Sequence, residues 1–239
     1  MQTIVIIPTY NEKENIEALV AQLLALPTGV CVIVVDDNSP DGTGVIVDRL
    51  SEKNDGRVSI IHRDGKLGLG TAYIAGFKQV LGGAADLIFT MDADFSHNPR
   101  YIPDMVEKIG QGYDLVIGSR YARGGGSTQT FGRKLFSCGA NTIARFMLGL
   151  RARDATAGFR CYRREVLEKM DFNSIKASGY SFLIEMLFNV QRCGWRVGEV
   201  PIFFEDRRMC ASKISKSEVI KALWTLFRLA PRRLTRKLA

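Results

Sequence analysis

The chain has 239 residues, of which 46% are hydrophobic and 24% charged, a composition typical of a globular protein with a sizeable core. It shows no signal peptide and no uncharged apolar run of about 20 residues, so we expect neither export nor a membrane-spanning helix. The five scattered cysteines include no Cys-x-x-Cys pair, which favours a reducing compartment over a disulfide or zinc framework, and the net charge is +8.

Short apolar segments alternate with helical patterns over the first 117 residues. The expected strands lie over residues 3–7, 31–35, 58–61, 86–91 and 114–117. Apolar residues recur at helical spacing between them, over residues 16–23, 45–50, 71–81 and 99–109. Strands that alternate with helices predict an α/β fold with a parallel, helix-covered sheet.

Polar residues gather where four of these strands end. They are Tyr10 and Glu12, Asp36 and Asp37, Asp92 and Asp94, and Ser119 and Arg120. Because open α/β sheets bind ligands at the carboxyl ends of their strands, the pattern predicts a nucleotide site along one edge. The chain has no P-loop, and its Gly68-Leu69-Gly70 run lacks the last small residue of the dinucleotide fingerprint, which disfavours a P-loop ATPase and a typical dehydrogenase.

Asp92 and Asp94 stand one residue apart, directly after the fourth strand. Residues i and i+2 of an extended chain share a face, so the two carboxylates are expected to point the same way. Neighbouring carboxylates repel, and a divalent cation bound through them and through substrate phosphates removes the conflict. A solvated turn with two acids is the alternative. His97 is expected to support or cap this turn and not to bind a metal.

The pattern changes in the second half of the chain. We expect a mobile glycine-rich loop over residues 124–128 and helices over residues 131–150 and 180–190. A short strand is expected over residues 160–162 and an extended segment over residues 195–204. Glu185 lies inside the second of these helices. An acid in such a place is usually solvated or paired with arginine, and a catalytic role is the minority case.

Charge separates along the chain. Residues 1–117 hold 9 basic and 16 acidic side chains, a net charge of −7, whereas residues 118–164 hold 10 basic side chains and Asp154 alone as an acid. Residues 165–205 have a net charge of −2 and residues 206–239 a net charge of +8. The separation indicates a metal and nucleotide half followed by a half that grips an anion, and merely solvated faces are the alternative.

Residues 215–239 are expected to form a basic amphipathic helix and tail. An apolar stripe on this helix includes Leu223 and Leu226, and the basic residues beyond Pro231 are Arg232, Arg233, Arg236 and Lys237. Together with Trp224, this pattern suits a membrane interface that carries anionic lipid. Packing of the helix on the domain is the alternative, because the stripe does not reveal what it faces.

Several motifs resemble those of family 2 glycosyltransferases of A-type fold. They are Ile7-Pro8-Thr9-Tyr10-Asn11-Glu12, Val35-Asp36-Asp37-Asn38-Ser39 and Met91-Asp92-Ala93-Asp94. Other motifs are similar to the dolichol-phosphate (polyprenol-phosphate) mannose synthases of that family: Asp94-Phe95-Ser96-His97-Asn98-Pro99, Gly118-Ser119-Arg120-Tyr121, Arg133-Lys134 with Ser137 and Gly139-Ala140-Asn141, Gly158-Phe159-Arg160, Gly198-Glu199-Val200-Pro201-Ile202, and Ser212-Lys213. The sequence differs from the family pattern at Cys210-Ala211, where the family commonly carries a glycine before Ser-Lys.

The resemblance implies a Rossmann-like, mostly parallel sheet in a catalytic domain over residues 1–214, followed by the helix and tail over 215–239. Within the domain, residues 1–117 would bind nucleotide and metal, and residues 118–214 the acceptor. The implied nucleotide-sugar residues are Pro8, Tyr10, Glu12, Asp37, Lys66, Asp92, Ala93, Asp94, Arg207 and Lys213. Asp92 and Asp94 would also hold Mg²⁺ or Mn²⁺. The implied acceptor-phosphate residues are Arg120, Arg133 and Ser137.

The implied reaction moves mannose from GDP-mannose to a polyprenyl or dolichyl monophosphate. A phosphate monoester, with a second pKa of about 6, is largely ionised at neutral pH, so it needs positioning more than a general base. Asp94, Arg120 and Asp154 are the expected catalytic residues, and Asp154 is expected to act by orienting arginine. Direct attack predicts inversion, which gives polyprenyl β-D-mannosyl phosphate.

Two other functions remain open. A related glycosyltransferase could use another sugar nucleotide, such as UDP-glucose, with polyprenyl phosphate or a polysaccharide. A nucleic-acid-binding protein could use the basic segments, but no recognition motif supports it, and we expect no nucleic acid partner. The expected location is the cytoplasmic face of a membrane, with contact through the terminal helix and a small membrane anchor protein as a further candidate partner.

Overall fold

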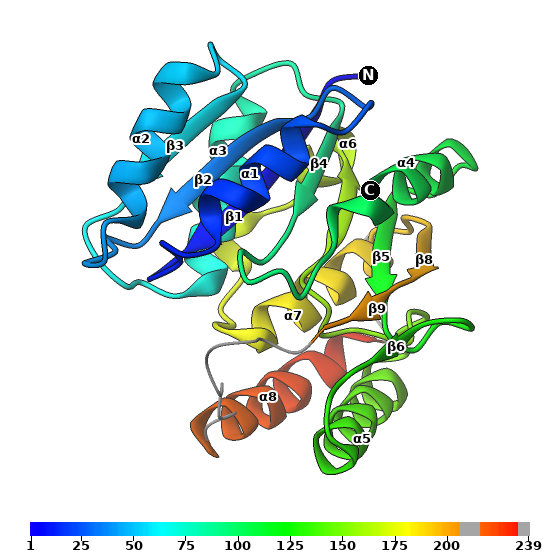
Figure 1. Cartoon of the computed structure of the whole chain (residues 1–239). Helices are drawn as coiled ribbons and strands as arrows, with labels where there is room; N and C mark the ends of the chain where they lie inside the picture. Colours follow the sequence, from blue (N-terminus) through cyan, green and yellow to red (C-terminus); the bar gives the residue numbers. More distant parts are fainter. Residues whose placement is uncertain (206–215, 234–239) are drawn as a thin grey trace.

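A seven-stranded sheet runs through the molecule in the order β3-β2-β1-β4-β7-β5-β8 (Figure 1). The computed structural model describes residues 1–205 and 216–233, apart from the side chains of residues 216–219. The strands of this sheet are β1 (Thr3–Thr9), β2 (Cys31–Asp36), β3 (Val58–His62), β4 (Leu87–Thr90), β5 (Leu115–Ser119), β7 (Arg160–Arg163) and β8 (Val197–Pro201). A short second sheet pairs β6 (Gly126–Ser127) with β9 (Phe203–Phe204).

Neighbouring strands of the large sheet are parallel except at β7. This strand runs antiparallel to both β4 and β5 and fills the space between them. The structure therefore confirms the mostly parallel α/β fold expected from the alternating pattern, with one reversed strand. The expected extended segment over residues 195–204 is divided into β8 and β9 around Ile202.

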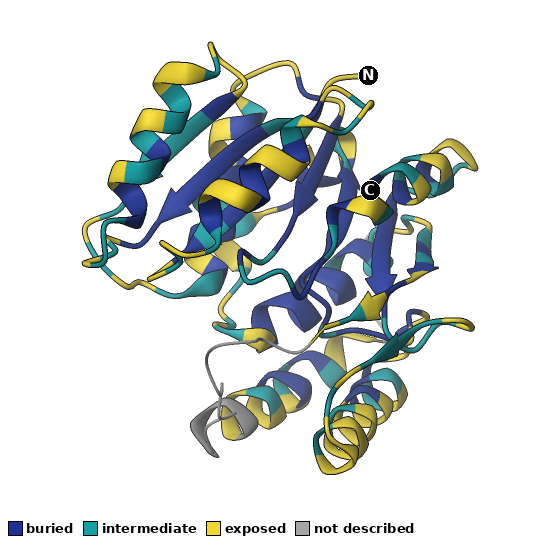
Figure 2. Cartoon of the chain, in the orientation of Figure 1, coloured by how far each residue is buried: buried dark blue, intermediate teal, exposed yellow. Residues whose placement is uncertain are grey.

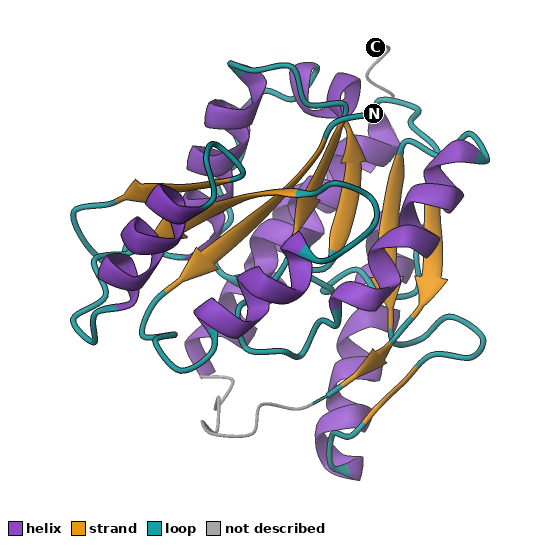
Figure 3. Cartoon of the chain, turned by 45° about the horizontal axis from the view of Figure 1, so that its top comes forward, coloured by secondary structure: helices purple, strands orange, loops and turns teal. Residues whose placement is uncertain are grey.

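Helices cover both faces of the sheet, which forms the middle layer in Figure 3. They are α1 (Ile16–Leu24), α2 (Thr43–Lys53), α3 (Leu69–Leu81), α4 (Ile102–Gly110), α5 (Phe131–Leu148), α6 (Arg164–Glu168), α7 (Tyr180–Arg192) and α8 (Lys216–Leu229). Short 3₁₀ segments in the described residues lie over Pro99–Tyr101, Phe172–Ser174 and Ala230–Arg233.

Side-chain alternation in the strands builds two cores. Val5 and Ile7 of β1 face the core under α1, α2 and α4, whereas Ile6 faces the core under α3 and α5–α8. Residues i and i+2 of a strand share a face, so a continuous apolar run fills both sides of the sheet.

The terminal helix α8 packs on the domain and also shows an apolar surface to solvent. Thr225, Leu226 and Leu229 are buried, while Trp224 and Phe227 are 64% and 68% exposed. Figure 2 shows the same division on α8 and a mostly exposed α5 beside it. Over the described residues, each helix is too short or too polar to cross a bilayer.

Candidate active site

The first part of the site lies where β1 and β2 end. Thr9 Oγ1 donates to Asp36 Oδ1 at 2.7 Å, and Ser39 donates to the same carboxylate from its hydroxyl and its backbone N–H. Asp36 is 2% exposed, and its buried carboxylate organises the turn after β2 through these hydrogen bonds. The next acid, Asp37, is thereby fixed at the edge of the sheet where the sequence predicts a nucleotide.

Asp37 is paired with a residue that sequence reasoning did not find. Arg63 Nη1 lies 2.7 Å from Asp37 Oδ1, and both side chains are 8% exposed. Burial raises the pKa of the Asp37 carboxyl above its ordinary value, although Arg63 and the backbone amides of Gly68 and Leu67 lower it in part. The carboxylate is therefore held in one orientation by groups from the segment after β3.

Tyr10, Glu12 and Lys66 lie near the same edge. Lys66 Nζ lies 4.1 Å from the centre of the Tyr10 ring. The Glu12 carboxylate accepts from Asn15 Nδ2 at 2.8 Å, while its backbone N–H donates to Thr43 Oγ1 at 3.0 Å. Pro8 pairs with Val35 near the end of β1. The structure thus brings the predicted residues of the first two turns together.

Asp92 and Asp94, in the turn after β4, both line one cavity. Ala93 between them is 3% exposed and packs in the core, and the two acids line a cavity of about 400 Å³. Asp94 Oδ1 accepts from the backbone N–H and the hydroxyl of Ser96, at 3.1 and 2.6 Å. This is the same-side arrangement that the alternation predicts.

Two buried residues support Asp92. The Tyr73 hydroxyl on α3 donates to Asp92 Oδ1 at 3.3 Å, and the Asp92 N–H donates to His97 Nδ1 at 3.1 Å. Burial, followed by the charge and hydrogen bond of Asp92, raises the pKa of Tyr73 well above its ordinary value, so the phenol keeps its proton. His97 thus supports the turn, and the contribution of Tyr73 had no signal in the sequence.

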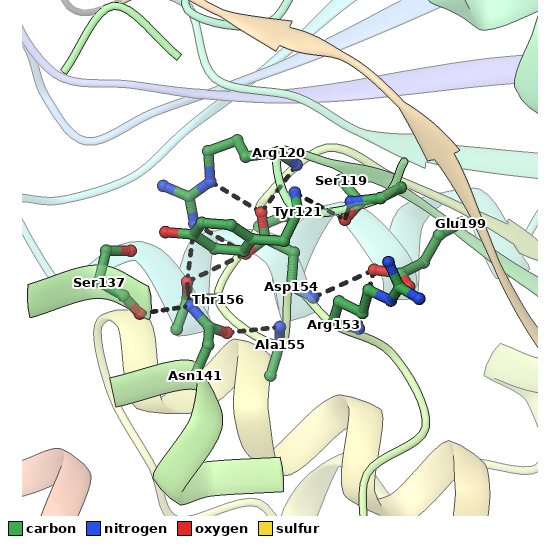
Figure 4. Close-up of polar contacts among 12 residues, drawn as sticks. Ser119, Arg120, Tyr121, Ser137, Asn141, Arg153, Asp154, Ala155, Thr156 and Glu199 are labelled. Atoms are coloured by element: carbon green, nitrogen blue, oxygen red, sulfur yellow. Dashed lines mark hydrogen bonds and ion pairs between the residues drawn. The ribbon is translucent and has the colours of Figure 1, made fainter. Parts of the chain in front are cut away.

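Arg120 and Asp154 form the centre of the second part of the site (Figure 4). Arg120 donates from Nε and Nη2 to the two carboxylate oxygens of Asp154, both at 2.7 Å, and from its backbone N–H at 3.1 Å. Asp154 is fully buried. Burial lowers the pKa of the Arg120 guanidinium, but the hydrogen bonds and charge of Asp154 raise it by more. Asp154 therefore orients Arg120, as the scarcity of acids in this segment suggested.

A hydrogen-bonded group from α5 holds the same loop. Asn141 Nδ2 donates to Thr156 Oγ1 at 3.2 Å, and Asn141 Oδ1 accepts from the Ala155 N–H at 2.8 Å. Thr156 in turn accepts from Arg120 Nη2 at 2.9 Å. Ser137, one helical turn before Asn141, hydrogen-bonds the side chain of Tyr121. These hydrogen bonds fix the position of α5 relative to Arg120.

Gly158 joins the two parts of the site. Its carbonyl accepts from Thr90 Oγ1 at 2.6 Å, and a Cβ at this position would lie 3.3 Å from Asp92 Oδ1. The loop that carries Asp154 therefore packs directly against the turn that carries Asp92, and a side chain at position 158 would require the Asp92 carboxylate to shift by a few tenths of an ångström.

The cavity brings together the acids of the first half and the basic residues of the second. The predicted site residues that line it are Asp92, Asp94, Arg120, Arg133 and Ser137. Of the other predicted residues in the described chain, Pro8, Tyr10, Glu12, Asp37 and Lys66 lie outside its lining, Ala93 is in the core and Asp154 lies behind Arg120. Arg207 and Lys213, together with Cys210 and Ala211, lie outside the described residues.

Apolar side chains form much of the remaining wall. They come from α5, α7 and α8 and include Phe136, Ile143, Leu183, Ile184, Leu223 and Leu226. A cavity lined by both charged and apolar side chains suits an amphiphilic ligand with an anionic head.

The sequence is similar to that of known glycosyltransferases. Residues 4–171 match the family described as Glycosyl transferase family 2. A protein of Mycolicibacterium smegmatis named polyprenol monophosphomannose synthase is 43% identical over 224 residues, which cover 93% of this chain and 84% of that protein. A protein of Micrococcus luteus named undecaprenyl-phosphate mannosyltransferase is 42% identical over 224 residues, which cover 93% of this chain and 91% of that protein.

The fold is similar to that of glucosyl-3-phosphoglycerate synthase from Mycobacterium tuberculosis. A crystal structure of that enzyme with Mn²⁺, UDP and glucosyl-3-phosphoglycerate has a TM-score of 0.68 at 20% identity and covers 96% of this chain and 80% of that chain. A second, with Mg²⁺ and UDP, has a TM-score of 0.68 at 20% identity and covers 96% and 79%. The likeness confirms the expected A-type glycosyltransferase fold. With the sequence match over most of its length, the chain belongs to glycosyl transferase family 2 and is a glycosyltransferase.

Proposed function

We propose that the protein transfers mannose from GDP-mannose to a polyprenyl or dolichyl monophosphate with inversion, and so makes polyprenyl β-D-mannosyl phosphate. The observation that carries the proposal is the single cavity of about 400 Å³, which has Asp92 and Asp94 at one part of its wall and Arg120 and Arg133 at another. The names of the two relatives, a polyprenol monophosphomannose synthase and an undecaprenyl-phosphate mannosyltransferase, support the choice of sugar and acceptor.

The residues at the Asp92–Asp94 turn fit a divalent cation. Both carboxylates reach the cavity, and the described part of the chain contains no cluster of three His, Cys, Asp or Glu side chains that would enclose an ion. Mg²⁺ usually takes one or two carboxylates and completes its shell with water and phosphate oxygens. We assign Asp92 and Asp94 to Mg²⁺ or Mn²⁺, which would neutralise charge on the leaving diphosphate when bound. The Mn²⁺ and Mg²⁺ complexes of the structural neighbour are consistent with this assignment.

We assign the nucleotide to the edge formed by the first two turns. Asp37 would accept hydrogen bonds from the nucleoside, and Tyr10 would offer a ring face beside Lys66, whose charge suits a phosphate. Pro8, Glu12 and Ala93 would shape the same site. Arg207 and Lys213, outside the described residues, are proposed to approach the diphosphate as the family motif implies.

Arg120, Arg133 and Ser137 are proposed to bind the acceptor phosphate. A guanidinium that is held by a bidentate carboxylate keeps its remaining donors in a fixed direction, which suits a phosphate oxygen. The acceptor is already an anion at neutral pH, because its second pKa is about 6. Asp154 is occupied by Arg120 through both oxygens, so it acts by positioning and not as a general base.

The exposed apolar faces of α5 and α8 are proposed to meet a membrane that supplies the lipid. The two helices lie side by side in Figure 1, and their exposed apolar residues are Phe131, Leu135, Phe136, Ile143 and Phe146 on α5 and Ile220, Leu223, Trp224 and Phe227 on α8. Arg233 is exposed and donates to the Phe146 carbonyl at 3.0 Å, so its charge lies beside this surface and suits anionic headgroups. We propose peripheral attachment on the cytoplasmic face, with a small membrane anchor protein as an additional partner.

A transfer assay tests the proposed function. Purified protein is given radiolabelled GDP-mannose and polyprenyl phosphate in vesicles, with and without a chelator, and the lipid product is analysed for its anomeric configuration. We expect a metal-dependent β-linked mannolipid. An α-linked product would contradict direct attack with inversion. Transfer to a sugar hydroxyl and not to polyprenyl phosphate would contradict the proposed function as a whole.

UDP-glucose is the second donor to test, because complexes of the structural neighbour contain UDP-glucose. The same assay with labelled UDP-glucose separates the two donors. A value of kcat/KM for UDP-glucose that exceeds the value for GDP-mannose would reassign the donor and leave the lipid phosphate acceptor in place.

A further inference from the structure

The ring of Phe204 lies between the two charged parts of the site. Its centre is 5.7 Å from the centre of the His97 imidazole, with the two planes at 69°, and Arg120 Cζ lies 5.3 Å from the same centre. Phe204 also lines the cavity with Asp92, Asp94 and Arg120. One side chain thus touches both the residue that supports Asp92 and the arginine assigned to the acceptor.

The short sheet formed by β6 and β9 fixes this ring. Ser127 pairs with Phe204, and the Thr128 N–H donates to the Phe204 carbonyl at 3.1 Å. The preceding residue, Phe203, points to the other face because side chains alternate along a strand. Phe203 is 46% exposed and lies against Gly126. The chain therefore offers two adjacent phenylalanines, of which only Phe204 reaches the site.

The Arg120 guanidinium is restrained by hydrogen bonds and by contact with two aromatic rings. Asp154 and Thr156 accept hydrogen bonds along the edge. Tyr121 and Phe204 each lie 5.3 Å from Arg120 Cζ, within cation–π range. The bidentate pair fixes the direction of the guanidinium within its own plane, and contact with the Phe204 ring adds a restraint that these hydrogen bonds do not supply.

We propose that Phe204 is a positioning residue that holds Arg120 for the acceptor phosphate and sets its place relative to the Asp92 turn through His97. The inference rests on the proposed function of Arg120. It predicts that loss of the Phe204 ring weakens binding of the acceptor and leaves binding of the nucleotide, assigned to the edge at Asp37 and Tyr10, unchanged.

Four variants test this role. Phe204→Leu keeps an apolar side chain and removes the ring, Phe204→Tyr and Phe204→Trp keep a ring, and Phe203→Leu is the matched control. We expect Phe204→Leu to raise the KM for polyprenyl phosphate about three- to tenfold, in line with a lost cation–π contact, while the KM for GDP-mannose stays within about twofold. Either ring-retaining variant restores the acceptor KM to within about twofold of the wild-type value.

A binding cycle separates this role from a general loss of packing. Affinity for a short-chain polyprenyl phosphate is measured for wild type, Phe204→Leu, Arg120→Met and the double variant, together with the thermal midpoint of each. We expect Phe204→Leu to weaken binding in the presence of Arg120 and to have little further effect once Arg120 is Met. Additive losses, an equal rise in both KM values, or the same loss in Phe203→Leu would overturn the inference.

The outcomes also distinguish this inference from the proposed function. If the wild-type protein transfers mannose to polyprenyl phosphate and the Phe204→Leu variant has an unchanged acceptor KM, the role of Phe204 is overturned and the proposed function stands. Absence of transfer by the wild-type protein overturns the proposed function and this inference with it.

Discussion

Amphipathic helices in the two halves of the molecule differ in how far their apolar side chains are buried. In the first half, α1 has 9 residues and buries Ile16, Leu19, Val20 and Leu23 against the sheet. In the second half, α5 has 18 residues and buries Asn141, Ala144 and Leu148. Phe131 and Phe146 at the two ends of α5 are 82% and 83% exposed. The apolar residues of α1 thus hold the domain together, whereas many of those on α5 are exposed, as the proposed membrane contact requires.

The charged groups divide along the same line. Asp37 pairs with Arg63 at the edge assigned to the nucleotide in the proposed function, and the Asp92–Asp94 turn carries two carboxylates. Beyond residue 118 the arginines dominate, and Arg120 is held by the one acid of its segment, Asp154. One half is thus suited to a cation and the other to an anion.

The largest expected effect comes from Asp92→Asn combined with Asp94→Asn. Loss of both charges removes the proposed metal site and with it the stabilisation of the leaving diphosphate, so kcat should fall about a thousandfold or more. Mannolipid formation is measured over a range of Mg²⁺ and Mn²⁺ concentrations. Asp104→Asn, on the exposed surface of α4, is the control and should retain full activity. Wild-type rates for the double variant in chelator would contradict the metal assignment.

Asp154→Asn tests the centre of the acceptor half. Removal of this charge leaves the buried Arg120 guanidinium without its partner, and a broken buried ion pair costs about 3–5 kcal/mol of unfolding free energy. Denaturant unfolding measures the loss, and the acceptor KM should rise in the same variant. Glu165→Gln, at an exposed acid on α6, provides the comparison and should change stability little. An unchanged unfolding free energy in Asp154→Asn would mean that the pair does not hold the loop.

Matched truncations on α1 and α5 test the comparison directly. Leu19→Ala should cost about 2–5 kcal/mol, because it leaves a cavity in the core. Phe146→Ala removes a larger side chain but should change the unfolding free energy by no more than about 0.5 kcal/mol. Both values come from denaturant unfolding in the absence of lipid. A large loss in Phe146→Ala would show that α5 is covered in solution.

Membrane attachment gives the smallest of the expected effects per residue. Phe227→Ser on α8 should weaken binding to anionic vesicles about tenfold, since burial of a phenylalanine is worth about 1.5–3 kcal/mol. Vesicle sedimentation measures the change. Val45→Ser, at an apolar residue of α2 that is 54% exposed, is the control in the other half and should bind vesicles as the wild type does. Equal losses in the two variants would contradict attachment through α5 and α8.

Much of the fold was predictable because local pattern decides it. Continuous apolar runs mark β1, β2 and β4, and the polar residues after them mark the edge that carries the site. Asp92 and Asp94 line one cavity with Ala93 buried between them, as the expected alternation has it, although β4 itself ends at Thr90. The antiparallel direction of β7 was not predictable, because four residues of strand carry no information on their direction in a sheet.

The partners within the site were harder to predict. Asp37 meets Arg63 and Asp92 meets Tyr73 because sheet order and helix packing bring separate segments together. Glu185 was expected to be solvated or paired with arginine, and Arg228 of α8 supplies that partner at 2.6 Å. The position of Phe204 had one signal in the sequence, its alternation with Phe203, but that pattern does not say which ring faces the site.

The place of β7 has a consequence for synthesis on the ribosome. Strands β4 and β5 follow one another in the chain, yet the edge of β4 is completed only by residues 160–163. At 5–20 residues per second, roughly 4–15 s separate translation of β4 from that of its neighbour. During that interval β4 can pair with β1, but its other edge, along Leu87, Ile88 and Phe89, lacks its partner strand and is exposed to chaperones and to misassembly if elongation stalls.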